Sequence, residues 1–453
     1  MRKLIIIGLA QTFLLLAGCG GGGGSVTTSN NGGSGSGSGG GTGSTPTNTV
    51  AITVDDGPDP SAGYDADTPF ITVTVCAPGS TSNCQTIDHV EVDTGSYGLR
   101  IISSVLNSSL AAALQPEQGS NSNAIVECTQ FVDGFSWGPV ALADVQIAGE
   151  SASNVPMQII GDSSYESEIP SACSSTGTEE DTVATFGANG IIGIGVFQQD
   201  CGGGCTLPTT NSENPAWYYT CPSGGTSTSD CTEAAVSESS QVTDPVADFA
   251  TDNNGVIVEI QSATEGATTD TGTLIFGIGT ESNNALGSQT VLTANSSYGD
   301  ISTAYDTQDG NDMILPYSYI DTGSNAYYFA DGGIPSGTSC SGQPGYSASN
   351  PQSWFCPPSE LNLSATNSGQ NGLQSMVSFS VGNAYTLFNT YQTGTVFDDL
   401  AASSGPEPSD CSASTTDTAC AFDFGFPFFL GRDVYIAFDG AMTTGGTGPY
   451  FAY

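Results

Sequence analysis

The chain has 453 residues and carries 46 acidic side chains against 4 basic ones, a formal net charge of −42. Such a charge repels nucleic acid and anionic lipid surfaces, so both are excluded as partners. The composition is rich in Gly, Ser, Thr and Asp, and short strand-like runs joined by turns dominate over helical patterns. We therefore predict an all-β protein.

The N-terminus has the pattern of an export signal. Arg2 and Lys3 precede an apolar run at 4–16, which is too short to span a membrane comfortably. The following Leu16-Ala17-Gly18-Cys19 resembles the lipobox of bacterial lipoproteins. The resemblance implies that Cys19 is lipidated and that the protein lies in the cell envelope. Gly20 in place of Asp indicates the outer membrane or cell surface; an ordinary cleaved signal peptide is the alternative.

The rest of the chain divides by composition. Residues 20–48 consist almost entirely of Gly, Ser, Thr and Asn, which cannot bury enough apolar surface to fold, and we expect a flexible tether. The remaining roughly 400 residues are too many for one compact core and suit two lobes. The predicted parts are a signal peptide over 1–19, the tether over 20–48, an N-terminal β lobe over 49–245 and a C-terminal β lobe over 246–453.

The cysteines indicate disulfides. Of the 13 cysteines, all but Cys19 are available for pairing, and an even number in an exported chain predicts up to six bridges. The proposed pairs, for which other connectivities stay open, are Cys76–Cys84, Cys128–Cys173, Cys201–Cys205, Cys221–Cys231, Cys340–Cys356 and Cys411–Cys420. With His89 as the single histidine and no paired C-x-x-C motifs, no metal site is expected.

Two strand-like runs end in the same tetrapeptide. Residues 90–92 lead into Asp93-Thr94-Gly95-Ser96, and residues 317–320 lead into Asp321-Thr322-Gly323-Ser324. One copy is a common polar turn in a chain of this composition, but one copy in each half is harder to explain by chance. An apolar-apolar-Gly triplet follows each copy, first Ile191-Ile192-Gly193 and then Phe429-Leu430-Gly431.

This doubled order resembles the pepsin family of aspartic peptidases, and also a bacterial lipoprotein family with the same doubled motif. The resemblance covers about residues 68–453, apart from a Cys-rich insertion near 198–240. It implies a bilobal pepsin-like fold, two related β lobes with a cleft between them, in which each apolar triplet packs beneath an Asp-Thr-Gly loop. It also implies an aspartic endopeptidase with Asp93 and Asp321 as catalytic residues, acting as a monomer on peptides or proteins without a cofactor.

The chemistry explains these residue types. Two adjacent carboxyl groups that share one proton can activate a water molecule and polarise a peptide carbonyl. Gly95 and Gly323 permit a sharp turn and a close backbone approach. By the resemblance, Thr94 and Thr322 hydrogen-bond across the lobes. We also expect the Ser96 and Ser324 hydroxyls to donate to the outer carboxylate oxygens.

Several features depart from the pepsin pattern. The flap region lacks the usual Tyr, so Phe131, Phe135 and Trp137 are the candidates to cover the cleft, or else are core aromatics on a hairpin. Without a flap Tyr, the alternative function is a catalytically inactive scaffold that binds peptides or surface proteins.

The remaining candidate residues are expected to have structural roles. Arg100 and Arg432 lie close to the motifs and are expected to form structural ion pairs, or else to act near the dyad. His89 is expected to be structural, and the acidic loop at 306–312 to be a solvated turn.

Overall fold

The computed structural model describes residues 47–59, 66–119, 121–132, 134–348, 353–405 and 411–453. Cys19, the signal peptide and nearly all of the predicted tether lie outside these residues. The predicted all-β fold is confirmed, because the described chain consists mainly of strands and its helices are at most two turns long. Within the described ranges, no helix has the length and apolar character needed to cross a membrane.

The strands of the first half precede residue 245. They are β1 (Thr49–Val54), β2 (Pro69–Cys76), β3 (Cys84–Asp93), β4 (Tyr97–Ile102), β5 (Ala124–Gln130), β6 (Gly134–Ile147), β7 (Glu150–Ile160), β8 (Thr178–Glu179), β9 (Gly190–Ile194), β10 (Tyr218–Cys221) and β11 (Thr232–Glu233).

The strands of the second half follow the short 3-10 helix η4 (Pro245–Asp248). They are β12 (Gly255–Ile260), β13 (Asp270–Phe276), β14 (Val291–Thr293), β15 (Ile301–Asp306), β16 (Asp312–Ile320), β17 (Tyr327–Phe329), β18 (Leu361–Ser368), β19 (Gln374–Val381), β20 (Ala401–Ser403), β21 (Asp423–Phe424), β22 (Asp433–Ala437), β23 (Met442–Thr443), β24 (Gly446–Thr447) and β25 (Tyr450–Ala452).

The helices are short surface pieces. The α-helices are α1 (Ser108–Ala111), α2 (Ser171–Ser174), α3 (Val183–Phe186), α4 (Gly203–Thr206) and α5 (Ala384–Thr390). The other 3-10 helices are η1 (Ser103–Val105), η2 (Glu166–Glu168), η3 (Glu238–Ser240), η5 (Gly337–Cys340) and η6 (Phe426–Phe428).

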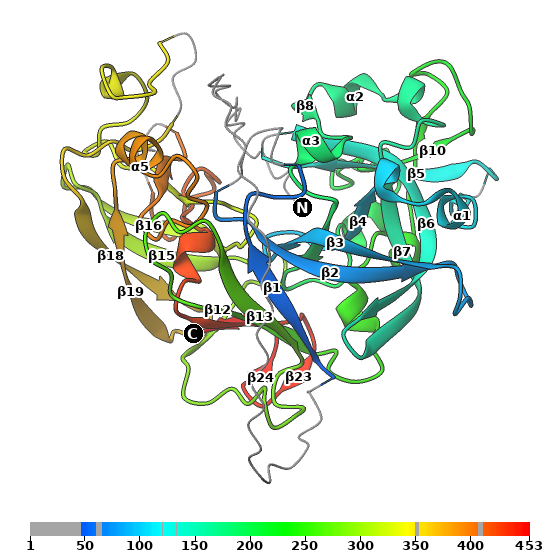
Figure 1. Cartoon of the computed structure of the whole chain (residues 1–453). Coiled ribbons are helices and arrows are strands. Elements are labelled where there is room, and N and C mark those ends of the chain that lie inside the picture. Colours follow the sequence, from blue (N-terminus) through cyan, green and yellow to red (C-terminus); the bar gives the residue numbers. More distant parts are fainter. Residues whose placement is uncertain (1–46, 60–65, 120, 133, 349–352, 406–410) are drawn as a thin grey trace, which may run out of the picture.

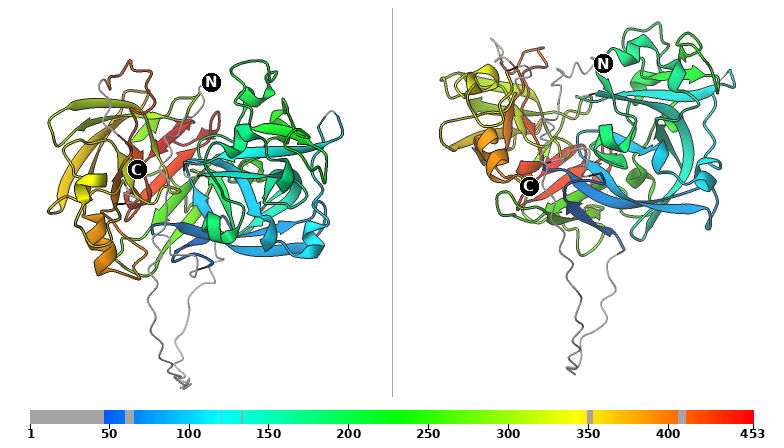
Figure 2. Two further views of the ribbon diagram at one scale, coloured as in Figure 1. Left: turned by 90° about the horizontal axis from the view of Figure 1, so that it is seen from above. Right: turned by 45° about the horizontal axis from the view of Figure 1, so that its top comes forward.

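Two sheets organise the molecule into two lobes that lie side by side (Figures 1 and 2). The larger sheet has the order β11-β10-β5-β6-β7-β4-β9-β3-β2-β1-β13-β12-β22-β25-β14, with β8 against β6. The second sheet has the order β19-β18-β15-β16-β21-β17-β20 and lies wholly in the second half. Strand β1 joins the two halves, because it pairs antiparallel with β13 along its whole length and with β2 at its end.

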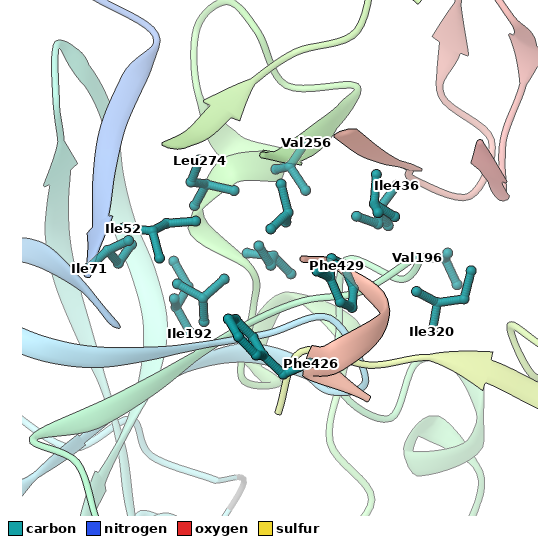
Figure 3. Close-up of a cluster of buried hydrophobic side chains, with 14 of the residues drawn as sticks. Ile52, Ile71, Ile192, Val196, Val256, Leu274, Ile320, Phe426, Phe429 and Ile436 are labelled. Atoms are coloured by element: carbon teal, nitrogen blue, oxygen red, sulfur yellow. The ribbon is translucent and has the colours of Figure 1, made fainter. Parts of the chain in front are cut away.

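One apolar core continues through both halves. Strands near the middle of the large sheet are buried on both faces, and β12 (Gly-Val-Ile-Val-Glu-Ile) is an almost uninterrupted apolar run for that reason. Figure 3 shows Ile52 and Ile192 from the first half beside Leu274, Val256 and Phe429 from the second. The strands that lead into the two Asp-Thr-Gly-Ser tetrapeptides are thus packed on a shared core.

All six predicted disulfides are confirmed. They join Cys76–Cys84, Cys128–Cys173, Cys201–Cys205, Cys221–Cys231, Cys340–Cys356 and Cys411–Cys420. The Cys-rich insertion forms α4, β10 and β11, and β10 extends the large sheet by pairing with β5. Each disulfide closes a loop within one half, so no covalent bridge crosses between the halves.

Candidate active site

The two Asp-Thr-Gly-Ser loops are built in the same way. In the first half the loop joins β3 to β4, and β9 pairs parallel with β3 and antiparallel with β4. In the second half the loop joins β16 to β17, and β21 pairs parallel with β16 and antiparallel with β17. Strand β9 in the first half and strand β21 in the second half therefore hold both the strand that enters the loop and the strand that leaves it.

The second apolar triplet lies elsewhere than the sequence predicted. In the first half Gly193 pairs with Asp93, as expected for Ile191-Ile192-Gly193. In the second half the paired residues are Asp423 and Phe424, and the Asp321 N–H donates to the Phe424 carbonyl at 3.0 Å. Leu430 instead bridges to Ile260, and Gly431 lies beside Ser262. The prediction for Phe429, Leu430 and Gly431 was wrong as to the strand that supports the loop, although Phe429 is buried in the shared core.

The threonines hold the two loops together. The Thr94 N–H donates to the Thr322 hydroxyl at 3.1 Å, and the Thr322 N–H donates to the Thr94 hydroxyl at 3.0 Å. Each hydroxyl in turn donates to a carbonyl of the opposite half, Thr94 to Ile320 at 2.9 Å and Thr322 to Val92 at 2.5 Å. This reciprocal set of four buried hydrogen bonds fixes the position of one loop against the other.

The aspartates face each other across this junction. A Cβ atom on Gly95 would lie 2.4 Å from Asp321 Cγ, and one on Gly323 would lie 2.7 Å from Asp93 Cγ. A Cβ atom at either position would therefore displace the carboxyl group of the opposite aspartate, since real Cβ contacts are essentially never this short. Asp93 is 6% exposed, whereas Gly95 and Gly323 at the loop tips are exposed, so the pair lies just beneath the surface.

The hydrogen bonds to the two carboxyl groups are unequal. Asp93 Oδ1 accepts from the Gly95 N–H at 2.7 Å and from the Ser96 N–H at 3.2 Å. Asp321 Oδ1 accepts from the Gly323 N–H at 2.8 Å, and Asp321 Oδ2 lies 3.1 Å from the Ser324 hydroxyl. The expected donation from a serine hydroxyl thus occurs at Ser324 only. Ser96 Oγ is buried without a hydrogen-bond partner among the described residues.

Electrostatics favours one shared proton on the pair. Burial raises the pKa of Asp321 well above its usual range, and the negative charges of Asp93 and Asp423 raise it further. The close approach of the Asp93 carboxyl group contributes to this rise in the pKa of Asp321. Like-charged carboxylates this close do not both ionise, so Asp321 keeps a proton under conditions in which an isolated aspartate loses it.

Asp423 is a third carboxyl group at this site, and the sequence analysis did not predict it. It occupies the position on β21 that Ile191 occupies on β9, is almost fully buried, and its Oδ2 lies 2.6 Å from Ser324 Oγ. Burial raises the pKa of Asp423 well above its usual range, and the Asp93 charge raises it further. The Ser324 hydroxyl lies within donating distance of both Asp423 and Asp321 but donates one proton only, so it serves one of the two carboxyl groups at a time.

Replacing Asp423 with Asn should stabilise the protein in alkaline solution. Burial raises the pKa of Asp423, so the folded protein favours the protonated carboxyl group. The stability associated with this group is fully present below the unfolded pKa near 4, and it is lost as the pH rises towards the folded pKa. We expect Asp423→Asn to increase the free energy of unfolding by about 1–3 kcal/mol at pH 8 and to leave it nearly unchanged at pH 4. Urea unfolding at pH 4 and pH 8 measures the change in the free energy of unfolding. Asp439→Asn, which removes an exposed carboxylate, is the control. An equal change at the two pH values, or a change at pH 8 no larger than that of the control, would refute the prediction.

The aromatic residues proposed for the flap do not share one environment. Phe135 and Trp137 are buried in a satellite core with Tyr165 and the Cys128–Cys173 disulfide, so the prediction that they cover the dyad was wrong. The hairpin β5–β6 directs them inward. Phe131, at the end of the hairpin, is half-buried and packs edge-on against Phe186 at 5.7 Å.

The basic residues have structural environments. Arg100 is 1% exposed and its guanidinium lies 2.7 Å from Glu127 and 3.2 Å from Asp200. Arg432 lies with its guanidinium 4.7 Å from the centre of the Phe428 ring, and neither Asp433 nor Asp439 forms an ion pair with it among the described contacts. The ion-pair prediction is therefore confirmed for Arg100 and wrong for Arg432.

His89 is structural, as predicted. It has a left-handed φ of 48° at a bulge between β2 and β3, and its ring packs against Phe70 at 5.2 Å.

These features define an all-β, two-lobed protein with one Asp-Thr-Gly loop from each lobe meeting at a single site. Residues 44–453 match the family described as "Protein of unknown function (DUF3443)", so the chain belongs to that family. The search of curated proteins found no match. Among solved structures, the chain is similar to the crystal structure of aspartic proteinase from Irpex lacteus, with 14% identity, a TM-score of 0.45, and coverage of 89% of this chain and 96% of that chain.

Proposed function

We propose that this protein is an aspartic endopeptidase that hydrolyses peptide bonds with a water molecule activated between Asp93 and Asp321. The observation that carries the proposal is the meeting of two carboxyl groups, one from each lobe, on loops locked together by reciprocal Thr94–Thr322 hydrogen bonds. A buried pair that shares one proton supplies a base and an acid at the same point.

The different surroundings of the two aspartates support Asp93 as the base and Asp321 as the acid. Asp93 accepts two backbone N–H bonds on one oxygen, an arrangement that suits a carboxylate, so Asp93 takes a proton from the attacking water. Asp321, whose pKa is raised by burial and by the neighbouring acids, carries the shared proton and donates a hydrogen bond to the substrate carbonyl. The proton that Asp93 receives is then available to the leaving nitrogen. No cofactor or metal takes part in this scheme.

We further propose that the protein acts in the cell envelope, at the outer membrane or cell surface, held by a lipid on Cys19 and spaced from the membrane by the tether. The lipobox-like residues 16–19 and the composition of residues 20–48 support this location. A monomer suffices, since both aspartates belong to one chain.

The test uses the chain after residue 19, which retains the buried Asn48 at the start of the folded part. An unfolded protein substrate is incubated with it from pH 3 to 7, with and without a statine-containing peptide that mimics the tetrahedral intermediate. We expect cleavage in acid, and inhibition with an affinity at least about 10²-fold above that of a substrate peptide. A well-folded protein that neither cleaves nor binds the mimic at any of these pH values would refute the peptidase.

The second candidate is an inactive peptide-binding scaffold with the same fold. The burial of Phe135 and Trp137 favours it, because neither is placed to close over a bound peptide. Binding of the statine peptide and of substrate peptides with equal affinity, without cleavage, would identify this alternative.

A further inference from the structure

A cluster of carboxyl groups lies apart from the dyad, where three loops meet. Glu265 comes from the β12–β13 loop, Asp398 and Asp399 precede β20, and Asp67 precedes β2. One carboxylate oxygen from each of Glu265, Asp398 and Asp399 lies within 4.8 Å of the others. Asp67 adjoins them, since its Oδ1 accepts from the Phe397 N–H at 2.8 Å.

Two carboxylate oxygens of the converging group, Asp399 Oδ1 and Glu265 Oε1, are buried and have no hydrogen-bond partner among the described residues. Asp399 is only 8% exposed. The adjoining Asp67 is 0% exposed, and its Oδ2 also has no partner among these residues. Buried polar atoms in proteins almost always find a partner, so the unpartnered oxygens of the group indicate a missing positive ligand.

No basic side chain compensates these charges. The ion pairs among the described residues involve Arg100 and His89 only, and none reaches this cluster. Neighbouring carboxylates without a counter-charge repel one another, so the cluster is costly as a set of free anions.

We infer that Glu265, Asp398 and Asp399 form a calcium-binding site beside the buried Asp67. Calcium takes six to eight oxygen ligands at about 2.3–2.6 Å, so oxygens on opposite sides of one ion are about 5 Å apart, in keeping with the convergence of the three carboxylates. Magnesium requires a stricter octahedron at about 2.0–2.1 Å and loses its water reluctantly, which suits this irregular set of loops less well. Asp398 is exposed and gives the ion a route from solvent.

A bound ion would connect segments far apart in the sequence. The loops already share backbone hydrogen bonds, from the Asp67 N–H to the Thr395 carbonyl at 2.7 Å and from the Gly266 N–H to the Val396 carbonyl at 2.8 Å. Carboxylates from the β12–β13 loop and from the segment before β20 would bind the same cation. Calcium thereby stabilises the packing of these two segments, against which Asp67 is hydrogen-bonded.

The experiment measures calcium binding by isothermal titration calorimetry and melting temperature, on the chain after residue 19, in 0.3 M NaCl to screen diffuse binding to the acidic surface. We expect one saturable site with a Kd on the order of 10⁻⁴–10⁻³ M, as in extracellular calcium modules. Calcium at 100 times the Kd should raise the melting temperature by about 3 °C, and magnesium at the same concentration by less.

Glu265→Gln combined with Asp399→Asn should weaken calcium binding by at least about 10-fold and abolish the shift in melting temperature. In chelator the double variant should melt at or above the wild-type temperature, because it carries fewer buried acids. The matched control, Asp309→Asn with Asp312→Asn, removes two exposed acids and should bind calcium as the wild type does.

Two results would overturn the site: a wild type without a saturable calcium site, or the same affinity in the cluster variant and the wild type. Either would leave these carboxyl groups as proton-sharing neighbours. Neither result bears on the peptidase, which is assayed separately.

Discussion

Asp93→Asn and Asp321→Asn should each lower kcat/KM for peptide cleavage by about 10²–10⁴-fold, the usual contribution of a positioned acid or base. Each substitution retains the shape of the side chain and most of its hydrogen bonds but fixes one partner in a neutral state. The remaining carboxyl group then has no neighbour with which to share a proton. Because the pair acts as a unit, the double variant should be about as slow as either single variant.

The matched control is Asp312→Asn, which removes an exposed carboxylate from the strand that leads into Asp321. Its cleavage rate should equal that of the wild type across pH 3–7, and circular dichroism should show all five proteins folded. Wild-type cleavage by folded Asp93→Asn or Asp321→Asn would place the catalytic groups elsewhere.

Arg100→Met should be the most destabilising single substitution proposed here, costing about 3–5 kcal/mol at pH 7. Arg100 donates to Glu127 at 2.7 Å, to Asp200 at 3.2 Å and to the Tyr97 carbonyl at 2.8 Å, all beneath the first Asp-Thr-Gly loop. Methionine fills much of the space but leaves a buried carboxylate without a cation. Urea unfolding at pH 7 measures the loss.

The pH dependence of this loss follows from the protonation of the two acids. Although burial opposes it, the Arg100 charge lowers the pKa of Glu127, while burial and the Glu127 charge raise the pKa of Asp200. Glu127 is thus the ionised partner, and its contribution to stability is lost as the pH falls through its folded pKa. The effect of Arg100→Met should therefore shrink in strongly acidic solution.

Asp200→Asn is the control, because it replaces a carboxyl group that already holds its proton and keeps the Arg100–Glu127 pair. It should change stability by less than about 1 kcal/mol at pH 7. If Arg100→Met were no more destabilising than this control, the buried Arg100–Glu127 ion pair would make no net contribution to the free energy of unfolding.

The repeated tetrapeptide predicted the meeting of Asp93 with Asp321, and the chain length predicted two lobes. Short spacing indicated five of the disulfides, and Cys128–Cys173 was the pair left over, with other connectivities open. The duplicated motif and the short-range pairs are readable because their signals are local or repeated. The second apolar triplet failed because apolar pairs followed by Gly are common, and only strand register selects between Gly425 and Gly431.

Other features of the site depend on contacts that no local pattern encodes. Asp423 breaks the apolar pattern expected of a strand beneath the loop, and its role follows from the distance to Ser324. The cluster of Asp67, Glu265, Asp398 and Asp399 draws on three separate loops, none of which has a metal-binding motif. The inward direction of Phe135 and Trp137 is set by the β5–β6 pairing and the packing around it.

The pairing of β1 has a consequence for how the protein matures. The first folded strand, Thr49–Val54, finds its main partner in Asp270–Ile275, more than two hundred residues later, while every disulfide closes a loop within one half. Under the export proposed above, oxidation would stabilise each lobe early, but the sheet that unites the lobes would form only after β13 has left the secretion channel. The Asp93–Asp321 pair would then assemble after export, outside the compartment where the protein is made.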